Sequence, residues 1–363
     1  MIFLSLIGAG YLILFFLKVY YLGIYFIPVD IKTLSLTPHL NISIVIACKN
    51  EIQNLPSLTK SLLELNYPRD CFEIIIVNDN SNNYTTDLLT EFASVKENIK
   101  IISANTKKYP AKKGAIDIGI SNARYNYILV TDADCSVEKD WILCTESAFR
   151  GGADVLFGIA PYYSVSEFPG NFFCYEQFYN SVTSFTAALY GNPYTAAARS
   201  FGFKKEVYYS IGGFDNMQNS LSGDDDLLIL EALKIEKVVI PIPYSLSGRV
   251  FSHPPAEFTS YLKQKSRHTK ASHFYPAKEK ILLYIYHLTN SALLLSVFIV
   301  HIHFAFIVFP ILKILGDVLI AGLFAKKFNY QFRFLNLLFY TFFLELIAPV
   351  HFINSVLKKD QWK

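Results

Sequence analysis

Two long apolar blocks restrict the folds open to this sequence. The first covers residues 1–27 and the second runs from about 281 to 357. About 20 consecutive apolar residues are enough for an α-helix to cross a bilayer. The whole chain has 17% charged residues, against about 25% in soluble domains, yet the stretch between the blocks has an ordinary soluble composition. We therefore expect a soluble domain over 41–275 that is held by membrane helices.

The N-terminal block is interrupted only by Lys18 and is not followed by a small-residue cleavage motif. This pattern favours a retained anchor helix over residues 1–28 rather than a cleaved signal peptide. The C-terminal membrane region, 281–357, has room for about three spans. They are expected near 281–301, 303–324 and 334–356.

The topology of the C-terminal region is left open by its charges. Basic residues within 326–333 predict a cytoplasmic loop. Three spans after a cytoplasmic domain would place Lys358 and Lys359 outside, so one segment could instead lie in the interface or re-enter. Lys313 and Asp317 are four residues apart inside a predicted span. A mutually neutralising pair near the interface is the favoured interpretation, and a contact along a translocation path is the alternative.

Net charge and cysteine usage exclude several classes of protein. The net charge of +3 is too small to indicate nucleic-acid binding. The five cysteines are odd in number and lack CxxC spacing, which predicts reduced thiols and no zinc site. Lysines and an arginine between 263 and 270 precede the second apolar block, as is typical of a cytoplasmic segment beside a membrane. The aromatic stretch 171–180 is more typical of a core or membrane-facing helix than of an acceptor site.

Strands and helices alternate regularly between residues 42 and 135. Such alternation predicts a parallel, doubly wound sheet, which binds ligands at the carboxyl ends of its strands. Glu51, Asp79 and Asp132 follow or close three of these strands and should share one edge. The strands are expected at 42–50, 72–81, 98–104 and 125–135, and the helices at 54–66, 85–94 and 112–123.

Asp132 and Asp134 stand one residue apart at the end of a predicted buried strand. Two carboxylates this close repel where water is scarce, and a divalent cation would offset that repulsion. Oxygen ligands suit Mg²⁺ and Mn²⁺. The sequence has no G-x-G-x-x-G and no G-x-x-x-x-G-K-[ST] motif. This absence argues against a nicotinamide-dependent oxidoreductase, and it means that a bound nucleotide would need a metal at its phosphates.

A set of motifs in a fixed order adds a family resemblance. From about Ile42 to Ser272 the chain resembles membrane-bound family-2 glycosyltransferases. The resemblance implies a GT-A fold, an α/β doubly wound mixed sheet with flanking transmembrane helices. The motifs are CKNE, VNDNSNN, AKKGAIDIGI, TDADC, IGGFD, GDDDL and QKSRH.

The resemblance implies roles for the residues at the strand ends. Asp132 and Asp134 match the DxD motif, which engages Mg²⁺ or Mn²⁺ and the diphosphate of the nucleotide sugar. Asp79 matches the aspartate that binds the uracil and ribose, although an Asx-turn would also explain it. Glu51 matches a nucleotide contact. Lys112 matches a lysine near the diphosphate or base, and a solvated helix start is its alternative.

Two further motifs carry the remaining implied roles. In GDDDL, Asp225 takes the position of the general base and Asp224 is the fallback. An acid-rich helix N-terminus also fits. In QKSRH, Gln264 and Arg267 match residues that bind the nucleotide sugar, but His268 replaces the family's tryptophan, which puts the type of acceptor in doubt. The alternative here is a basic amphipathic helix at the membrane surface, which would also account for Tyr261, Lys263 and Lys265.

The resemblance as a whole implies a multi-pass protein of the cell membrane with a cytoplasmic catalytic domain. It would be a metal-dependent inverting glycosyltransferase that moves a sugar from a nucleotide-diphosphate sugar, expected to be a UDP-sugar, to a lipid-linked or glycan acceptor. A processive polysaccharide synthase is one alternative, and a catalytically degenerate membrane scaffold or transporter component is another. The complete acidic set argues against degeneracy, and about four membrane helices without the tryptophan favour lipid-linked assembly.

Overall fold

The computed structural model describes residues 2–34 and 39–357, which form two compact units. The membrane unit comprises residues 2–24, 163–186 and 254–357. The sheet unit comprises the described residues of 25–162 and 187–253. The expected tail residues Lys358 and Lys359 lie outside the described residues.

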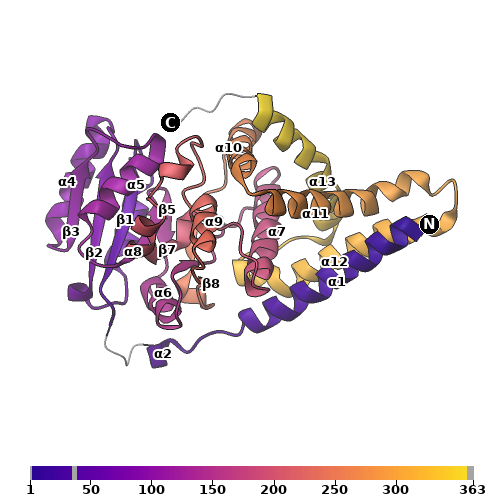
Figure 1. The fold of residues 1–363 in the computed structure, drawn as a ribbon, viewed down its shortest axis with the longest axis horizontal. Helices are drawn as coiled ribbons and strands as arrows, with labels where there is room; N and C mark the ends of the chain where they lie inside the picture. The colour runs from indigo at the N-terminus through magenta and orange to yellow at the C-terminus, as the bar shows by residue number, and fades with distance from the viewer. Residues whose placement is uncertain (1, 35–38, 358–363) are drawn as a thin grey trace. The chain divides into compact units, whose positions relative to one another are not determined.

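The sheet unit is built on four parallel strands, as the sequence predicts. They are adjacent in the order β3-β2-β1-β4 (Figure 1). The β-branched residues of the three inner strands, β2, β1 and β4, are buried on both faces, which explains their nearly continuous apolar runs. The strands are β1 (Ile42–Cys48), β2 (Phe72–Asn78), β3 (Ile99–Ser103) and β4 (Tyr127–Asp132).

Three shorter strands complete the seven-stranded sheet and make it mixed. The order beyond β4 is β7-β6-β8, and β7 runs antiparallel to both β4 and β6. The strands are β7 (Phe201–Lys204), β6 (Val155–Phe157) and β8 (Val239–Pro241). A separate two-stranded sheet pairs β5 (Cys135–Val137) with β9 (Val250–Ser252). The mixed sheet agrees with the fold that the family resemblance implies.

Helices of the sheet unit pack on the parallel strands through their apolar faces. Leu55, Leu58 and Leu62 of α3 are buried, as their spacing predicts. Asn82 caps α4 by accepting a hydrogen bond from the Thr85 N–H. The helices are α2 (Ile31–Leu34), α3 (Leu55–Leu63), α4 (Asn83–Val95), α5 (Ala111–Asn122), α6 (Trp141–Arg150), α8 (Lys205–Ser210) and α9 (Asp226–Lys234). Short 3-10 helices lie at Arg69–Cys71, Ala198–Ser200, Asp215–Met217 and Leu246–Gly248.

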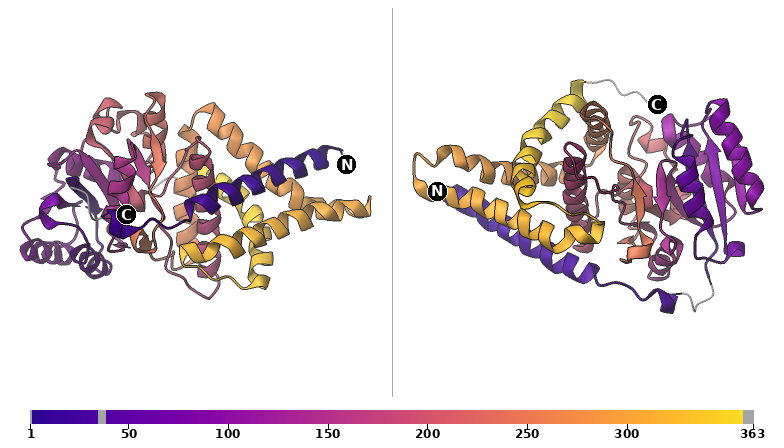
Figure 2. Two further views of the ribbon diagram at one scale, coloured as in Figure 1. Left: turned by 90° about the horizontal axis from the view of Figure 1, so that it is seen from below. Right: turned by 180° about the vertical axis from the view of Figure 1, so that it is seen from behind.

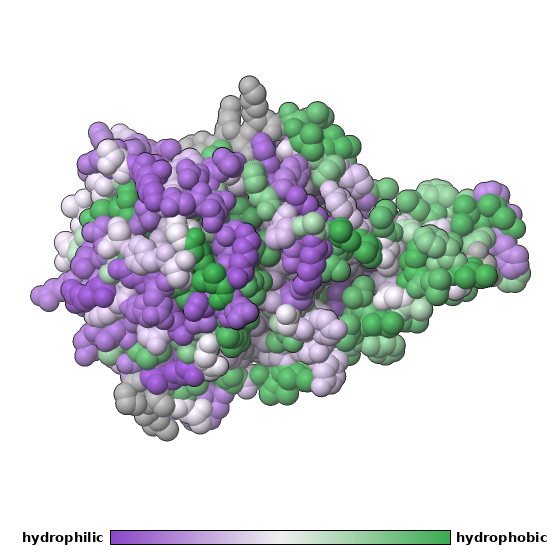
Figure 3. Space-filling model, viewed as in Figure 1, coloured by the Kyte–Doolittle hydropathy of each residue, from purple (hydrophilic) through white to green (hydrophobic). Residues whose placement is uncertain are grey.

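The described residues include four helical segments long and apolar enough to cross a membrane, close to the predicted places. They are Ile2–Tyr25, Ala277–Ile299, Phe304–Phe328 and Phe334–Leu357. Their α-helical parts are α1 (Ile2–Tyr25), α11 (Ala277–Leu295), α12 (Val308–Phe324) and α13 (Phe334–Leu357). α1 runs beside α12 (Figure 2), and apolar residues cover the outer surfaces of these helices (Figure 3).

The aromatic stretch 171–180 lies on α7 (Gly170–Leu189), which is not among the four membrane-type helices. Within the membrane unit its rings are buried, and Phe173 stacks on Tyr261 of α10 (Phe258–Ala271) with ring centroids 4.1 Å apart. The core interpretation of this stretch is therefore confirmed.

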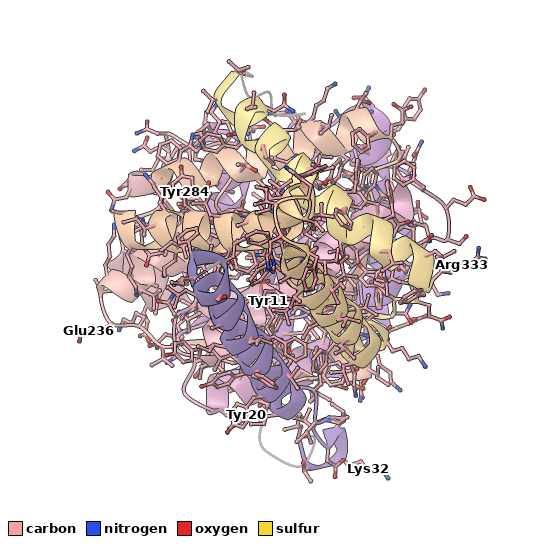
Figure 4. All side chains as sticks on the ribbon, turned by 90° about the vertical axis from the view of Figure 1, so that its right-hand side faces the viewer. Tyr11, Tyr20, Lys32, Glu236, Tyr284 and Arg333 are labelled. Carbon is pink, nitrogen blue, oxygen red and sulfur yellow. The ribbon has the colours of Figure 1, made fainter. Side chains whose placement is uncertain are left out.

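Lys313 and Asp317 form a buried ion pair inside the membrane unit. Asp317 also accepts hydrogen bonds from the hydroxyls of Tyr11 and Tyr179, at 3.2 and 2.9 Å. Figure 4 places Tyr11 among the helices and Tyr20 toward the outer edge of α1. The mutual neutralisation expected from the sequence is present, and hydroxyl groups complete it.

Candidate active site

The polar residues at three strand ends lie at one edge of the sheet. In the strand register Cys48 is opposite Asn78, and Ala47 is opposite Asp132. Asp79 directly follows β2, so it stands beside the end of β1, with Asp132 on the other side. The prediction that these strand ends share an edge is confirmed.

The end of β4 offers two carboxylates to a cation. Ligand atoms of Asp132, Asp134 and Cys135 lie within 4.8 Å of one another. Burial, together with the charges of Asp132 and Asp134, raises the pKa of the Cys135 thiol, so the thiol stays protonated. The Asp132 Oδ1 atom is buried and has no aligned hydrogen-bond donor among the described residues. Two hard oxygen ligands this close together fit Mg²⁺ or Mn²⁺.

Lys112 links Asp132, a candidate metal ligand, to Asp224, the first of three consecutive aspartates. Its Nζ lies 2.6 Å from Asp132 Oδ1 and 2.6 Å from Asp224 Oδ2. The contact with Asp132 is a close charge contact rather than an aligned hydrogen bond. Burial alone would raise the pKa of Asp224, but the charge and the hydrogen bond of Lys112 lower it below the usual value. Lys112 is therefore not a solvated helix start, because only 11% of its side chain is exposed.

The three consecutive aspartates stand at the N-terminus of α9. Asp225 is the N-cap, and its Oδ1 accepts a hydrogen bond of 2.8 Å from the Asp226 N–H. Gly223 has a φ of +88°, which lets the chain turn into this helix. Burial, followed by the charges of Asp226 and Asp224, raises the pKa of Asp225 well above its usual value. The prediction of an acid-rich helix N-terminus is confirmed. The raised pKa also suits the Asp225 carboxylate to accepting a proton.

Asp79 is paired with a lysine that sequence reasoning missed. The carboxylate is almost fully buried, and Lys107 Nζ lies 2.6 and 2.8 Å from its two oxygens. Lys107 also donates to the Ala111 carbonyl at 3.2 Å. The alternative of an Asx-turn at Asp79 is wrong, because it is Asn78 whose side chain accepts a hydrogen bond from the Ser81 N–H.

Glu51 has a local role at the start of α3. Its Oε2 accepts a hydrogen bond of 2.7 Å from Asn54 Nδ2, and its carbonyl accepts from the Asn54 and Leu55 N–H groups. These contacts order the loop between β1 and α3. Contact with a nucleotide stays a prediction for this residue.

Lys113, the neighbour of Lys112, is a second residue that the motifs did not single out. Its side chain is fully buried, with 0% exposed, and its ammonium donates to main-chain carbonyls in the segment 217–222. No sequence signal marks this contact, because the partners are backbone oxygens.

Gln264 and Arg267 lie on α10, which belongs to the membrane unit. Their contact with a diphosphate stays a prediction. The alternative of a basic amphipathic helix at the membrane surface stays open, but one of its basic residues is used inside the unit. Tyr261 is buried, and Lys265 forms an ion pair of 2.8 Å with the buried Glu176.

Comparison with solved structures defines the class of fold. The mannosyltransferase PcManGT from Pyrobaculum calidifontis, solved in complex with GDP-Man and Mn²⁺, superposes with a TM-score of 0.57 over 98% of both chains, at 14% identity. At this identity the likeness shows the fold alone, which is the GT-A fold. The chain adds to it helices apolar enough to span a membrane.

Sequence comparison adds a family match and several relatives. Residues 43–208 match the family model described as glycosyl transferase family 2. A beta-monoglucosyldiacylglycerol synthase from Nostoc is 32% identical over 109 residues, which are 30% of this chain and 23% of that protein. A poly-beta-1,6-N-acetyl-D-glucosamine synthase from Staphylococcus aureus is 33% identical over 99 residues, 27% of this chain and 23% of that protein. The chain thus spans about a quarter of the length of these relatives.

Proposed function

We propose that this protein is a membrane-anchored, metal-dependent, inverting glycosyltransferase that uses a nucleotide-sugar donor. The observation that carries the proposal is the acidic edge of the sheet. Asp132 and Asp134 close β4, Lys112 ties Asp132 to Asp224, and the adjacent Asp225 has a raised pKa. Such a set serves both a diphosphate leaving group and an attacking hydroxyl.

Asp132 and Asp134 would hold Mg²⁺ or Mn²⁺. When bound there, the ion would neutralise charge on the diphosphate as it leaves the sugar. Ligand atoms of these two carboxylates lie within 4.8 Å of each other, which supports this role. The mannosyltransferase with this fold is in complex with GDP-Man and Mn²⁺, which supports a nucleotide sugar and a divalent ion here.

Asp225 is the proposed general base, in preference to Asp224. Asp224 is held by Lys112 at 2.6 Å, and this contact lowers its pKa, which makes it a weak base. Asp225 keeps a raised pKa because of burial and its acidic neighbours, so it can take the proton of an acceptor hydroxyl. Attack from the face of the sugar opposite the leaving group gives inversion.

Asp79 and Glu51 would contact the nucleoside, with UDP-sugar as the expected donor. The Asp79 carboxylate can accept a hydrogen bond from a base N–H, and Lys107 holds it in place. Gln264 and Arg267 would bind the diphosphate, since a guanidinium matches phosphate oxygens in geometry and charge.

A lipid-linked acceptor is proposed, with the active domain on the cytoplasmic side of the cell membrane. Four helical segments of membrane-crossing length support a site at a bilayer. The relative named a glucosyldiacylglycerol synthase supports a lipid acceptor. A growing glycan is the second candidate, because another relative is named a poly-N-acetylglucosamine synthase.

The test uses the full chain in lipid nanodiscs with a panel of UDP-, GDP-, dTDP- and CDP-sugars. Release of nucleoside diphosphate and sugar transfer to diacylglycerol, polyprenyl phosphate or glycan primers are measured with Mg²⁺, Mn²⁺ and EDTA. We expect one donor class to turn over only with metal. Asp134→Ala and Asp225→Asn should each reduce turnover by about 100-fold or more. Asp87→Asn, which changes an exposed carboxylate on α4, is the matched control and should be as active as wild type.

Two outcomes would contradict the proposal. Absence of turnover of every donor, with all acceptors supplied, would favour the scaffold alternative. Turnover that survives EDTA and Asp134→Ala would remove the metal from the reaction.

A further inference from the structure

Lys113 is a buried cation without a carboxylate in hydrogen-bond contact. A lysine side chain usually keeps its ammonium in water, but that of Lys113 is 0% exposed. An ammonium in this position needs a hydrogen-bond acceptor for each of its three N–H groups. The acceptors are the carbonyls of Met217, Ser220 and Ser222, at 2.8, 2.7 and 2.6 Å.

These three carbonyls belong to one short segment, 217–222. The segment has no strand and no α-helix, and only its first residue falls in a 3-10 helix. It leads directly into Gly223, whose positive φ turns the chain toward the three aspartates. An ammonium that binds the first, fourth and sixth residues of the segment holds the segment along its whole length. It therefore fixes the positions of Asp224 and Asp225, which follow the segment.

Carbonyl oxygens satisfy the hydrogen bonds of Lys113 but leave its net charge. That charge acts on Asp224, Asp226 and Asp225, each of which interacts electrostatically with Lys113. The other charged groups that act on Asp225 are the two flanking aspartates, Asp224 and Asp226, and Lys112. Two lysines thus oppose three carboxylates at the N-terminus of α9.

We propose that Lys113 is a positioning residue for the base Asp225. It binds the carbonyls of 217–222, thereby sets the place of Asp225, and supplies a buried positive charge behind the acidic loop. This inference rests on the proposed function of Asp225. It differs from the role of Lys112, which touches Asp132 and Asp224 directly.

Lys112 and Lys113 are neighbours on α5, so one helix can contact both the carboxylates and the segment 217–222. Consecutive helical residues point about 100° apart around the helix axis. Lys112 therefore reaches the carboxylates, while Lys113 reaches the main chain of the segment that precedes them. Together they link the end of β4 to the start of α9 through the first turn of α5.

The experiment compares Lys113→Met, Lys113→Arg and Lys205→Met in the full chain in nanodiscs. Methionine keeps an unbranched apolar side chain without charge, and arginine keeps the charge with a different donor geometry. Lys205→Met is the matched control, because Lys205 also donates to a main-chain carbonyl, that of Ala123 at 2.7 Å, but not to the acidic segment. Folded fraction, kcat, donor KM and the pH profile of kcat are measured for each variant.

We expect Lys113→Met to lower kcat by about 100-fold, the scale of a misplaced reacting group, with donor KM changed by less than about 3-fold. Loss of the buried charge should also move the acid limb of the pH profile upward by about one unit. Lys113→Arg should leave the limb near its wild-type pH while kcat stays reduced by about 10-fold. Lys205→Met should change neither quantity.

A folded Lys113→Met with wild-type kcat and an unmoved acid limb would overturn the inference. If Lys113→Met does not fold, Lys113→Arg decides: reduced kcat per folded molecule supports the role, and wild-type kcat overturns it. Failure of the underlying function is distinct, because it would show as full activity in Asp225→Asn. An inactive Asp225→Asn beside a normal Lys113→Met would reject the positioning role alone.

Discussion

Lys113 in the sheet unit and Lys313 in the membrane unit are both fully buried, and their surroundings accommodate them in different ways. In the sheet unit the Lys113 ammonium donates to three main-chain carbonyls. In the membrane unit Lys313 is ion-paired with Asp317, donates to the Tyr179 hydroxyl at 3.0 Å, and lies 4.0 Å from Glu345 Oε1. Both side chains are 0% exposed, so burial alone does not distinguish them.

The kind of acceptor decides what the buried charge can do. Carbonyls satisfy the N–H groups and leave a positive charge that acts on nearby aspartates, which suits a site rich in carboxylates. A carboxylate cancels the charge, which suits an apolar helix cluster where an uncompensated ion is costly. The buried charge of Lys113 is thus expected to control chemistry, and that of Lys313 to control folding.

The largest effect is expected for Asp225→Asn in the sheet unit. Loss of the base should lower kcat by about 10²–10⁴-fold. The unfolding free energy should stay equal or rise, because one of three mutually repelling carboxylates is removed. Turnover and thermal unfolding of the same preparation check both parts. A loss of stability that parallels the loss of kcat would break the comparison between the units.

Asp317→Asn in the membrane unit should behave in the opposite way. It removes the closer of the two carboxylates that face the Lys313 ammonium and leaves only Glu345, at 4.0 Å. Breaking the closer pair should destabilise by up to about 3–5 kcal/mol. The kcat per folded molecule should remain that of wild type. The double variant Lys313→Met/Asp317→Leu should recover most of the lost stability, as measured by unfolding in detergent. A double variant that is no more stable than Asp317→Asn would show that the pair does more than neutralise itself.

The four parallel strands and the acidic edge could be predicted, because the apolar runs and the polar residues that end them are local in sequence. The runs before Cys48, Asn78 and Asp132 are buried on both faces and therefore read as strands. Lys113 could not be separated from Lys112, since two adjacent lysines at a helix start look alike and carbonyl partners leave no pattern. Lys107 was missed because its partner, Asp79, is 28 residues away in sequence. The antiparallel strand β7 was missed because its four residues are too few to show a strand pattern.

The pH dependence of stability should have opposite signs for Glu176 and Asp225. Burial would raise the pKa of Glu176, but Lys265 and His351 lower it to about 2 from an ordinary value of 4.5. Because the folded pKa is the lower one, Glu176 stabilises above about pH 4.5, and this contribution is lost as pH falls toward 2. Asp225 has a raised folded pKa, so it destabilises at neutral pH and this penalty shrinks on acidification.

Glu176→Gln should therefore lower the unfolding free energy at pH 7 by about 3 kcal/mol and flatten its decline between pH 5 and pH 2. Asp225→Asn should remove the gain in unfolding free energy that comes when acidification from neutral pH protonates Asp225. Unfolding is followed in detergent from neutral pH down to about pH 2, with Glu236→Gln, a change of an exposed acid, as control. A Glu176→Gln curve that parallels wild type would show that the ion pair with Lys265 has no net effect on stability.

The smallest effects separate the units by packing rather than charge. A Cβ on Gly119 of α5 would come 2.3 Å from Val45 Cγ1 of β1, whereas a Cβ on Gly10 of α1 would meet nothing within 4 Å. Gly119→Ala should therefore destabilise by about 1–3 kcal/mol, because the helix must move away from the sheet. Gly10→Ala should be neutral or slightly stabilising, since alanine favours a helix. Thermal unfolding of both variants measures the difference, and equal midpoints would mean that α5 can shift on the sheet without loss of packing.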